Sequence, residues 1–325
     1  MKILVTGANG FVGRALVAHF LDLGHTVRAT GRAAQVKQGG PESRPGLEYL
    51  GGYDFDVDAN WMPALAGVDV IVHAAARVHH PDAGHASALP AFRQVNTRAT
   101  LDLASQARQA GVRRFIFISS VKVLGESTAT GAPFRADDPP RPIDGYGISK
   151  HEAEQGLLGM AQSGGMEVTI IRPPLVYGPG VRANFRSMMK WLGMGIPLPL
   201  GSISNRRSLV GLGNLVDLIG VCLDHPGARN QVFMAADGAD LSTPELLRHT
   251  AQALGRRAHL LPVPVSWLRL GASLLGKQDM LQRLCESLQV DIEKNRQLLG
   301  WTPPNTVDQE LARTAAAFLR EASQP

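Results

Sequence analysis

The chain of 325 residues is poor in the features that mark secreted or membrane-spanning proteins. It has two cysteines, Cys222 and Cys285, which cannot form a disulfide framework and favour a reducing compartment, the cytoplasm. No apolar run reaches the roughly 18 to 20 residues of a membrane span. The best candidate, residues 263–276, is interrupted by Arg269. Because the chain starts directly with a strand-like segment, residues 2–6, we expect neither a signal peptide nor a membrane span.

The chain also lacks a large excess of charge of either sign, since its net charge is only +5. Basic residues are dispersed in short pairs such as Arg113-Arg114, without a basic run or interleaved aromatic residues. We therefore expect no nucleic-acid partner. An anionic small substrate accounts for some of the arginines equally well.

Two stretches suggest special sites that the rest of the sequence does not support. His79, His80 and His85 share a loop, but no further ligands at zinc-binding spacing accompany them, so we expect no metal. Residues 267–275 form an amphipathic stretch that contains Arg269. For this stretch we expect packing in the protein core in preference to contact with a membrane.

The N-terminal half alternates short β-branched apolar runs with amphipathic stretches. The runs that we interpret as buried strands are residues 2–6, 26–30, 68–73, 113–119 and 166–171. This alternation is typical of parallel βαβ units. The sequence therefore predicts an α/β fold with a Rossmann-type doubly wound parallel sheet.

Beyond Arg172, proline pairs and short helices predict a smaller, irregular C-terminal lobe that binds the substrate. A helix and a strand in residues 208–235 are expected to return to the sheet. The predicted domains are therefore a dinucleotide-binding domain of residues 1–173 plus about 208–235, and a substrate-binding lobe of residues 174–207 and 236–325.

A glycine-rich turn follows the first strand directly and opens a helix. It reads Thr6-Gly7-Ala8-Asn9-Gly10-Phe11-Val12-Gly13, with the spacing G-x-x-G-x-x-G. Glycines allow a tight turn and let the backbone approach a pyrophosphate, whose charge then lies at the helix N-terminus. The turn predicts a dinucleotide site.

The end of the second strand indicates which dinucleotide binds. An acid there would bind a ribose hydroxyl, whereas an arginine suits a 2′-phosphate. The chain has Thr30-Gly31-Arg32 at this point. A guanidinium can pair with phosphate through two hydrogen bonds. Arg32 therefore favours NADP(H), with NAD(H) as the alternative.

A proton-transfer pair is expected in Tyr146-Gly147-Ile148-Ser149-Lys150. Residues four apart share one face of a helix. A phenol with a pKa of about 10 is a poor base at neutral pH, and a nearby cation lowers that pKa. We therefore expect Lys150 to make Tyr146 competent to give and take a proton.

Together these motifs resemble the extended short-chain dehydrogenase/reductase family, in its nucleotide-sugar epimerase/dehydratase branch. Besides the turn and the Tyr146–Lys150 pair, the resemblance rests on His73-Ala74-Ala75-Ala76, Asn96, residues 115–125, Arg172-Pro173, Tyr177-Gly178-Pro179-Gly180 and Leu299-Gly300-Trp301. The family implies an enzyme that moves a hydride between a nicotinamide dinucleotide and a sugar. A non-catalytic NADP-sensing regulator on the same scaffold is the alternative of another class.

The resemblance also assigns roles to individual residues. The catalytic residues that it implies are Ser120, Tyr146 and Lys150. Besides the turn residues Gly7, Asn9, Gly10, Phe11, Val12 and Gly13, the implied cofactor contacts are Arg32, Asp54, Phe55, Ala74, Ala75, Ala76, Asn96, Tyr146, Lys150 and Pro173. Arg207 resembles the arginine that holds the substrate diphosphate, Asn184 is a second expected contact, and the loop of residues 125–143 is expected to cover the sugar.

The residues after Ser120 reduce the number of reactions that the family resemblance allows. Dehydratases of this family carry an Asp-Glu pair where this chain has Val121 and Lys122. A 4,6-dehydratase is therefore not expected. Lys122 is interpreted either as a solvated lysine or as a charge beside the sugar.

A resemblance to a subgroup from bacterial polysaccharide clusters leaves two reactions at C4 of a UDP-linked hexose or hexosamine. Arg32 favours NADPH-dependent reduction of a UDP-4-keto-6-deoxy-sugar, because net reduction needs an exchangeable cofactor. The alternative is an NAD-dependent UDP-hexose 4-epimerase. Relatives dimerise through two long helices, so we expect a homodimer formed through residues 89–110 and 146–161.

Overall fold

The computed structural model describes residues 1–31, 44–53, 55, 59–78, 88–129, 131–274, 276 and 278–322, apart from the side chains of residues 279 and 280. The predictions for Arg32, Asp54 and the histidine loop fall outside the described residues.

The core of the molecule is a seven-stranded sheet in which every pair of neighbours is parallel. Its strands are β1 (Lys2–Thr6), β2 (Thr26–Gly31), β3 (Leu47–Gly51), β4 (Val70–His73), β5 (Arg114–Ile118), β6 (Glu167–Arg172) and β9 (Gln231–Met234). Their order is β3-β2-β1-β4-β5-β6-β9. The chain thus moves outward from β1 in one direction and then in the other, which brings the carboxyl ends of β1 and β4 together at the switch point.

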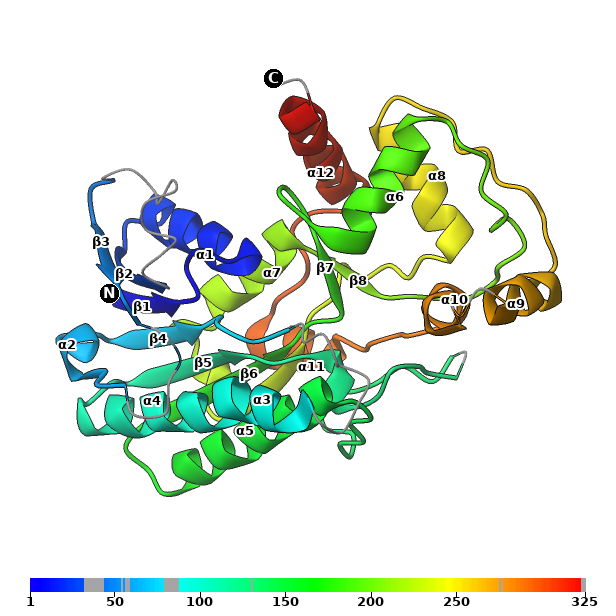
Figure 1. Ribbon diagram of the computed structural model, residues 1–325. Coiled ribbons are helices and arrows are strands. Elements are labelled where there is room, and N and C mark those ends of the chain that lie inside the picture. Colours follow the sequence, from blue (N-terminus) through cyan, green and yellow to red (C-terminus); the bar gives the residue numbers. More distant parts are fainter. Residues whose placement is uncertain are drawn as a thin grey trace.

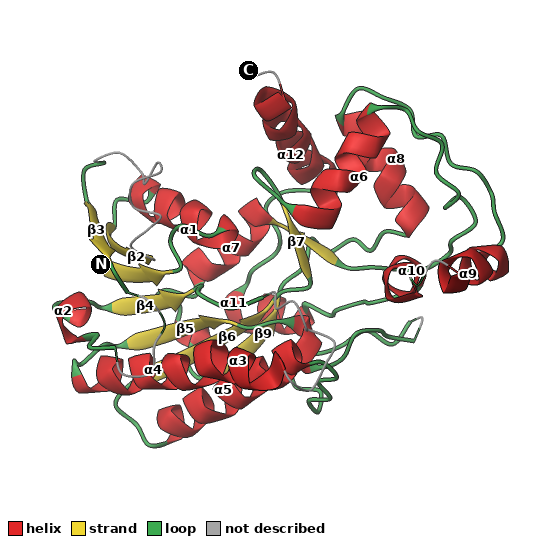
Figure 2. Ribbon diagram, in the orientation of Figure 1, coloured by secondary structure: helices red, strands yellow, loops and turns green. Residues whose placement is uncertain are grey.

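Helices cover both faces of this sheet (Figures 1 and 2). One face carries α1 (Phe11–Asp22), α7 (Leu212–Val221), the short 3₁₀ helix η5 (Pro226–Ala228) and α11 (Glu293–Leu299). The other carries α2 (Met62–Leu65), α3 (Leu89–Phe92), the π-helical turn η3 (Arg93–Arg98), α4 (Ala99–Gln109) and α5 (Gly145–Gln162). Between β5 and α5 lies the 3₁₀ turn η4 (Val121–Val123).

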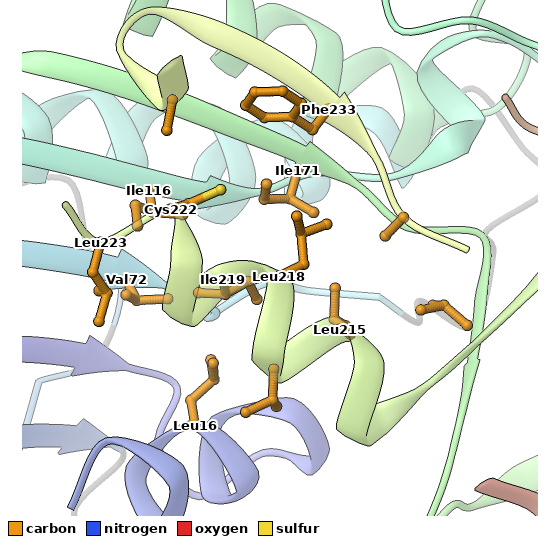
Figure 3. Close-up of a cluster of buried hydrophobic side chains, with 14 of the residues drawn as sticks. Leu16, Val72, Ile116, Ile171, Leu215, Leu218, Ile219, Cys222, Leu223 and Phe233 are labelled. Carbon is orange, nitrogen blue, oxygen red and sulfur yellow. The ribbon is translucent and has the colours of Figure 1, made fainter. Parts of the chain in front are cut away.

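The packing of α7 explains why the strands are apolar on both sides. Its Leu215, Leu218 and Ile219 lie among Leu16 of α1 and sheet residues such as Ile171 (Figure 3). A second cluster, which includes Trp61, Leu103 and Leu157, fills the opposite face. Strands buried on both faces read as continuous apolar runs.

A second lobe follows the sheet. It contains the paired strands β7 (Leu175–Tyr177) and β8 (Leu209–Gly211) and the helices α6 (Ala183–Gly193), α8 (Thr243–Ala253), α9 (Val265–Leu274), α10 (Gln278–Cys285) and α12 (Val307–Ala322). Its core includes Tyr177, Phe185, Leu247 and Leu311. Residues 288–301 contribute Leu299 and Trp301 to the core beside the sheet. The domain boundaries expected from the sequence remain a proposal.

The predicted Rossmann-type sheet is confirmed, including the return of α7 and β9. The sequence analysis did not identify β3, whose Leu47–Gly51 is largely half-buried at the edge of the sheet. It also missed the three-residue strands β7 and β8, which are too short for a periodic pattern.

The expectation of core packing for residues 267–275 is wrong for α9. Every residue of α9 is described and none is buried. Trp267 is 74% exposed and Leu274 is 80% exposed. The amphipathic pattern is present, but no other described element covers the stripe formed by Trp267, Leu270 and Leu274.

None of the helices in the described part of the chain combines the length and the hydropathy required to span a bilayer.

Candidate active site

The turn after β1 needs each of its three glycines. Gly7 has φ +67°, and a Cβ there would lie 2.8 Å from the Ala75 backbone. A Cβ on Gly13 would lie 2.1 Å from the Gly7 carbonyl oxygen, and one on Gly10 would lie 3.0 Å from the same atom. The turn therefore packs directly on the end of β4, and only glycine fits.

The first turn of α1 offers free backbone donors. Gly10 is the N-cap residue, no side chain of the described residues caps this end, and no acid lies in the first turn. Phe11 and Val12 follow directly and are half-buried. A helix N-terminus with uncapped N–H groups attracts an anion such as a pyrophosphate.

Asn9 is held at the end of β2. Its Nδ2 donates to the Tyr49 hydroxyl at 2.5 Å, and burial raises the pKa of that phenol. A Cβ on Gly31 would lie 2.6 Å from the Tyr49 hydroxyl and 2.7 Å from Asn9 Nδ2. Tyr49 was missed because it lies on the unrecognised strand β3.

A buried polar chain runs under the site. Thr6 Oγ1 and His73 Nδ1 lie 2.7 Å apart, and His73 Nε2 lies 2.9 Å from Thr100 Oγ1. Burial, assisted by the charge of Lys150, lowers the pKa of His73 to about 3. His73 is thus a neutral ring, and it stacks on Phe117 with 5.8 Å between ring centroids.

Lys150 lies over the ring of Phe117. Its Nζ is 4.0 Å from the centroid of that ring, and the residue is 1% exposed. Burial lowers the pKa of Lys150 to about 7, although the charge of Glu154 opposes the shift. Glu154 is itself paired with Arg172 at 2.6 Å in a buried ion pair.

Ser120 and Tyr146 come from adjoining elements, η4 and the first turn of α5. Ser120 is the N-cap of η4, and its Oγ accepts from Lys122 N at 3.3 Å. A Cβ on Gly147 would lie 2.7 Å from the Lys122 carbonyl oxygen, so the two turns are in direct contact. Pro173 supports η4, because its carbonyl accepts from Val121 N at 3.0 Å.

The pKa of Tyr146 differs from the sequence-based expectation. Burial, together with the negative charge of Asp144, raises the pKa of this phenol above its usual value. Without a bound cofactor, Tyr146 is thus a protonated acid at neutral pH. Lys150 does not lower the pKa of Tyr146 as expected, because burial and Asp144 decide its direction.

Lys122 is an ion-paired, partly buried lysine, and its expected position beside the sugar stays a prediction. Its Nζ donates to Asp144 Oδ2 at 2.5 Å and to Glu126 Oε1 at 2.7 Å. Burial alone would lower the pKa of Lys122, but the two carboxylates outweigh it and raise the pKa. Asp144 also caps α5, since its Oδ1 accepts from Gly147 N at 2.7 Å. Asp144 was missed, although an aspartate before a helical run is a recognisable N-cap signal.

The side chain of Asn96 is fully engaged in hydrogen bonds to Arg77 and Ser149. Its Nδ2 donates to the Arg77 carbonyl and to Ser149 Oγ, each at 3.0 Å, while its Oδ1 accepts from Arg77 N at 2.8 Å. Both amide protons are used, so Asn96 joins the stretch after β4 to α5. Ala74 and Ala75, which begin that stretch together with Ala76, lie beside the glycine turn. Phe55 packs edge-on against His73.

Two of the predicted substrate residues, Arg207 and Asn184, lie on the second lobe, whereas Lys122 lies on η4 beside the sheet. Arg207 donates through Nη1 to the carbonyls of Arg283 and Glu286, at 2.8 and 3.0 Å. Burial lowers the pKa of its guanidinium. Asn184 is exposed in the first turn of α6. The loop of residues 125–143 bonds across to residues 287–291, so it spans from the sheet to the part of the chain that follows α10.

The described residues fit a dinucleotide at the carboxyl edge of the sheet. The glycine turn leaves no room for side chains, and the first turn of α1 is uncapped. Thr30 Oγ1 and Ser119 Oγ, at the ends of β2 and β5, are buried without a hydrogen-bond partner among the described residues. Buried hydroxyls of this kind can hydrogen-bond a bound group or an ordered water.

A cleft of about 1100 Å³ lies elsewhere, between α1 and other helices of the molecule. Residues of α1, α7, α6 and α12 line it, and of the predicted site residues that the structure describes, Phe11 alone takes part. Ion pairs between Arg186 and Glu321 and between Arg313 and Glu310 cross or border it. This cleft is therefore distinct from the strand-end site.

Residues 3–235 match the NAD dependent epimerase/dehydratase family. The chain is 47% identical to a UDP-glucose 4-epimerase of Vibrio cholerae over 321 residues, covering 98% of this chain and 96% of that protein. It is 27% identical to an N-acetyl-alpha-D-glucosaminyl-diphospho-ditrans,octacis-undecaprenol 4-epimerase of Escherichia coli O157:H7, covering 96% of this chain and 94% of that protein. A solved structure of MoeE5 in complex with UDP-glucose and NAD has the same fold, with a TM-score of 0.77 at 24% identity, over 99% of this chain and 100% of that one.

Proposed function

Because the chain belongs to the NAD dependent epimerase/dehydratase family, we propose that it inverts C4 of a UDP-linked hexose with bound NAD as its cofactor. It is an NAD(P)-dependent enzyme of the nucleotide-sugar branch of the extended short-chain dehydrogenases/reductases. The observation that carries the proposal is the direct contact between the turn that follows Ser120 and the helix that carries Tyr146 and Lys150.

Epimerisation is the alternative in the sequence analysis, and the relatives favour it over reduction. The relative that shares 47% of its residues is named a UDP-glucose 4-epimerase. Epimerisation returns the cofactor to its starting state in each turnover, so a retained NAD suffices. The preference for NADP(H) rests on Arg32, which lies outside the described residues, and it stays a prediction.

The chain's own residues supply the proton chemistry. A nicotinamide dinucleotide, when bound, would supply reversible hydride acceptance at C4. Tyr146 would take the proton from the C4 hydroxyl and later return it, while Ser120 would hydrogen-bond the same oxygen. Burial raises the pKa of the Tyr146 phenol. Tyr146 therefore needs additional positive charge nearby to act as a base. Lys150 contributes to that charge below its pKa of about 7.

Inversion at C4 also requires the second lobe to hold the substrate in two orientations. Hydride must leave one face of the sugar and return to the other, so both faces have to be presented to one site. A substrate held by its diphosphate can turn its sugar while staying bound. Arg207 is the proposed anchor, since the carbonyls of Arg283 and Glu286 hold its guanidinium in place.

The test is the interconversion of UDP-glucose and UDP-galactose by the wild type and Tyr146→Phe. We expect Tyr146→Phe to lower kcat by about 10² to 10⁴-fold and to leave dinucleotide binding nearly intact. Tyr53→Phe is the matched control, because it also removes one phenol hydroxyl. It keeps the ring, which stacks on Trp61 with 4.7 Å between the ring centroids. Wild-type protein that reduces a 4-keto sugar with NADPH but epimerises no UDP-hexose would contradict the proposal.

The cofactor is tested by releasing and identifying the dinucleotide of the purified protein. Retained NAD supports the epimerase. An empty site that binds NADPH tightly would support the reductase and the role expected for Arg32. Binding of either dinucleotide without turnover on any nucleotide sugar would favour the regulator.

A further inference from the structure

The far edge of the second lobe exposes large apolar side chains. On α9, Trp267, Leu270 and Leu274 follow the helical spacing i, i+3, i+7 and are 74%, 65% and 80% exposed. They thus lie on one face of the helix. An exposed apolar stripe of this size marks an interaction site.

Two further segments continue this edge. The chain after α6 runs beside the chain that leads into α9, along one side of the molecule (Figure 1). Leu198 and Leu261 are joined by a backbone hydrogen bond of 2.8 Å, and Gly201 N donates to the Leu261 carbonyl at 3.0 Å. On these segments Met194 is 64% exposed and Leu261 is 50% exposed.

The charge of both segments has one sign. Residues 168–216 and 246–278 contain arginine and lysine but no aspartate or glutamate. Arg256 and Arg257 are exposed and precede the apolar stripe in the sequence, whereas the charge of Arg269 acts on Cys285 of α10. The edge is therefore both apolar and basic, which is the complement of an anionic lipid surface.

We propose that the second lobe docks on an anionic lipid surface through Trp267, Leu270 and Leu274 of α9, with Arg256 and Arg257 close to the lipid phosphates. Tryptophan and leucine beside basic residues are typical of helices that lie in the membrane interface. At about 1.5 Å per residue, the ten residues of α9 reach about half of a hydrocarbon core of ~30 Å, so the helix lies in the interface plane.

Docking would bring the site close to the membrane. The helix that follows α9 ends at Cys285, and the neighbouring carbonyls of Arg283 and Glu286 hold Arg207. Since α9 packs on α10, the docked surface is connected through α10 to the proposed diphosphate anchor. The inference does not depend on whether the reaction is epimerisation or reduction.

The experiment is flotation of the full chain with vesicles of phosphatidylcholine alone and of phosphatidylcholine mixed equally with phosphatidylglycerol. We expect the wild type to float with the anionic vesicles and to be released by high salt. Combining Trp267→Ser, Leu270→Ser and Leu274→Ser should lower the bound fraction about tenfold. These side chains are exposed, so turnover without vesicles should be unchanged, which also verifies folding.

The matched control combines Leu23→Ser and Leu319→Ser, which are 54% and 49% exposed on α1's C-terminal end and on α12. It should float like the wild type. A second readout uses Trp191→Phe, which leaves Trp267 as the exposed tryptophan because Trp61 and Trp301 are buried. Brominated lipid should quench the fluorescence of Trp267 in this variant.

Three outcomes would overturn the proposal. They are no flotation with either vesicle, equal flotation of the wild type and the triple variant, and a wild-type oligomer that the triple variant converts to monomers. The last would assign the stripe to a second copy of the chain.

Discussion

At the scale of single residues, Lys122 shows how its partners decide what a side chain can do. Its ammonium lies between the carboxylates of Asp144 and Glu126. A partly exposed ion pair of this kind contributes on the order of 1 kcal/mol or less. Its larger consequence is geometric, because Asp144 also caps the helix that begins with Gly145 and Tyr146. We interpret Lys122 as a residue that holds this helix start against η4.

The pKa of Lys150 leads to a prediction about stability. Between its folded pKa of about 7 and its ordinary value of 10.5, the unfolded chain binds more protons than the folded protein. Stability therefore rises with pH across that window, by at most about 1.4 kcal/mol per pH unit. Below pH 7 both states carry the charge, and this contribution is constant.

Urea unfolding of dinucleotide-free protein between neutral and alkaline pH measures this effect. The difference in free energy of unfolding between the wild type and Lys150→Met should increase in favour of the wild type as pH rises. A difference that stays constant from pH 7 to pH 10 would contradict the lowered pKa of Lys150.

At the scale of elements, the glycine turn has to satisfy two conditions at once. Gly7 needs a positive φ, and it also needs space beside Ala75. Gly24 has a similar φ of +77°, but a Cβ there would meet nothing within 4 Å among the described residues. The two glycines therefore separate backbone strain from steric contact.

We expect Gly24→Ala to cost about 1–2 kcal/mol of stability through its left-handed backbone, with dinucleotide binding unchanged. Gly7→Ala should cost more and should also abolish dinucleotide binding, because the turn must move away from β4. Chemical denaturation and fluorescence titration with NAD and NADPH measure both effects. Equal losses in the two variants would show that space at Gly7 does not matter.

At the scale of the whole molecule, α4 and α5 form an outer layer beside the sheet, on the side opposite α1 and α7 (Figure 1). They touch each other closely, since a Cβ on Gly156 would lie 2.5 Å from Leu101 Cδ2. We propose that this layer pairs with the same layer of a second copy. Its outward side includes Gly159, which is exposed and has no described residue within 4 Å of a Cβ.

Gly159→Arg should therefore be accommodated within one chain but should disrupt the dimer. We expect light scattering after size-exclusion chromatography to give two copies for the wild type and one for the variant. Gly193→Arg on α6, which also has open space around its Cβ, should stay dimeric. A monomeric wild type, or a dimeric Gly159→Arg, would exclude this interface.

Much of the fold was predictable because its signals are local. Buried parallel strands read as apolar runs, and the glycine spacing of residues 7–13 marks a phosphate-binding turn wherever it follows a strand. The four-residue spacing of Tyr146 and Lys150 likewise places both on one helix face. These features depend on neighbours in the chain, so the sequence by itself determined most of the sheet, the turn and the helix that carries Tyr146 and Lys150.

Tertiary structure decided what each of these residues meets. Lys122 pairs with Asp144, which is 22 residues away, and Asn96 bonds to Ser149 across 53 residues. Burial in the folded chain, and not the four-residue spacing, sets the pKa values of Tyr146 and Lys150. The stripe of α9 was visible in the sequence, yet only the packing of the second lobe left it uncovered. A pattern states which face of an element is apolar, whereas the element that covers it comes from a distant part of the chain.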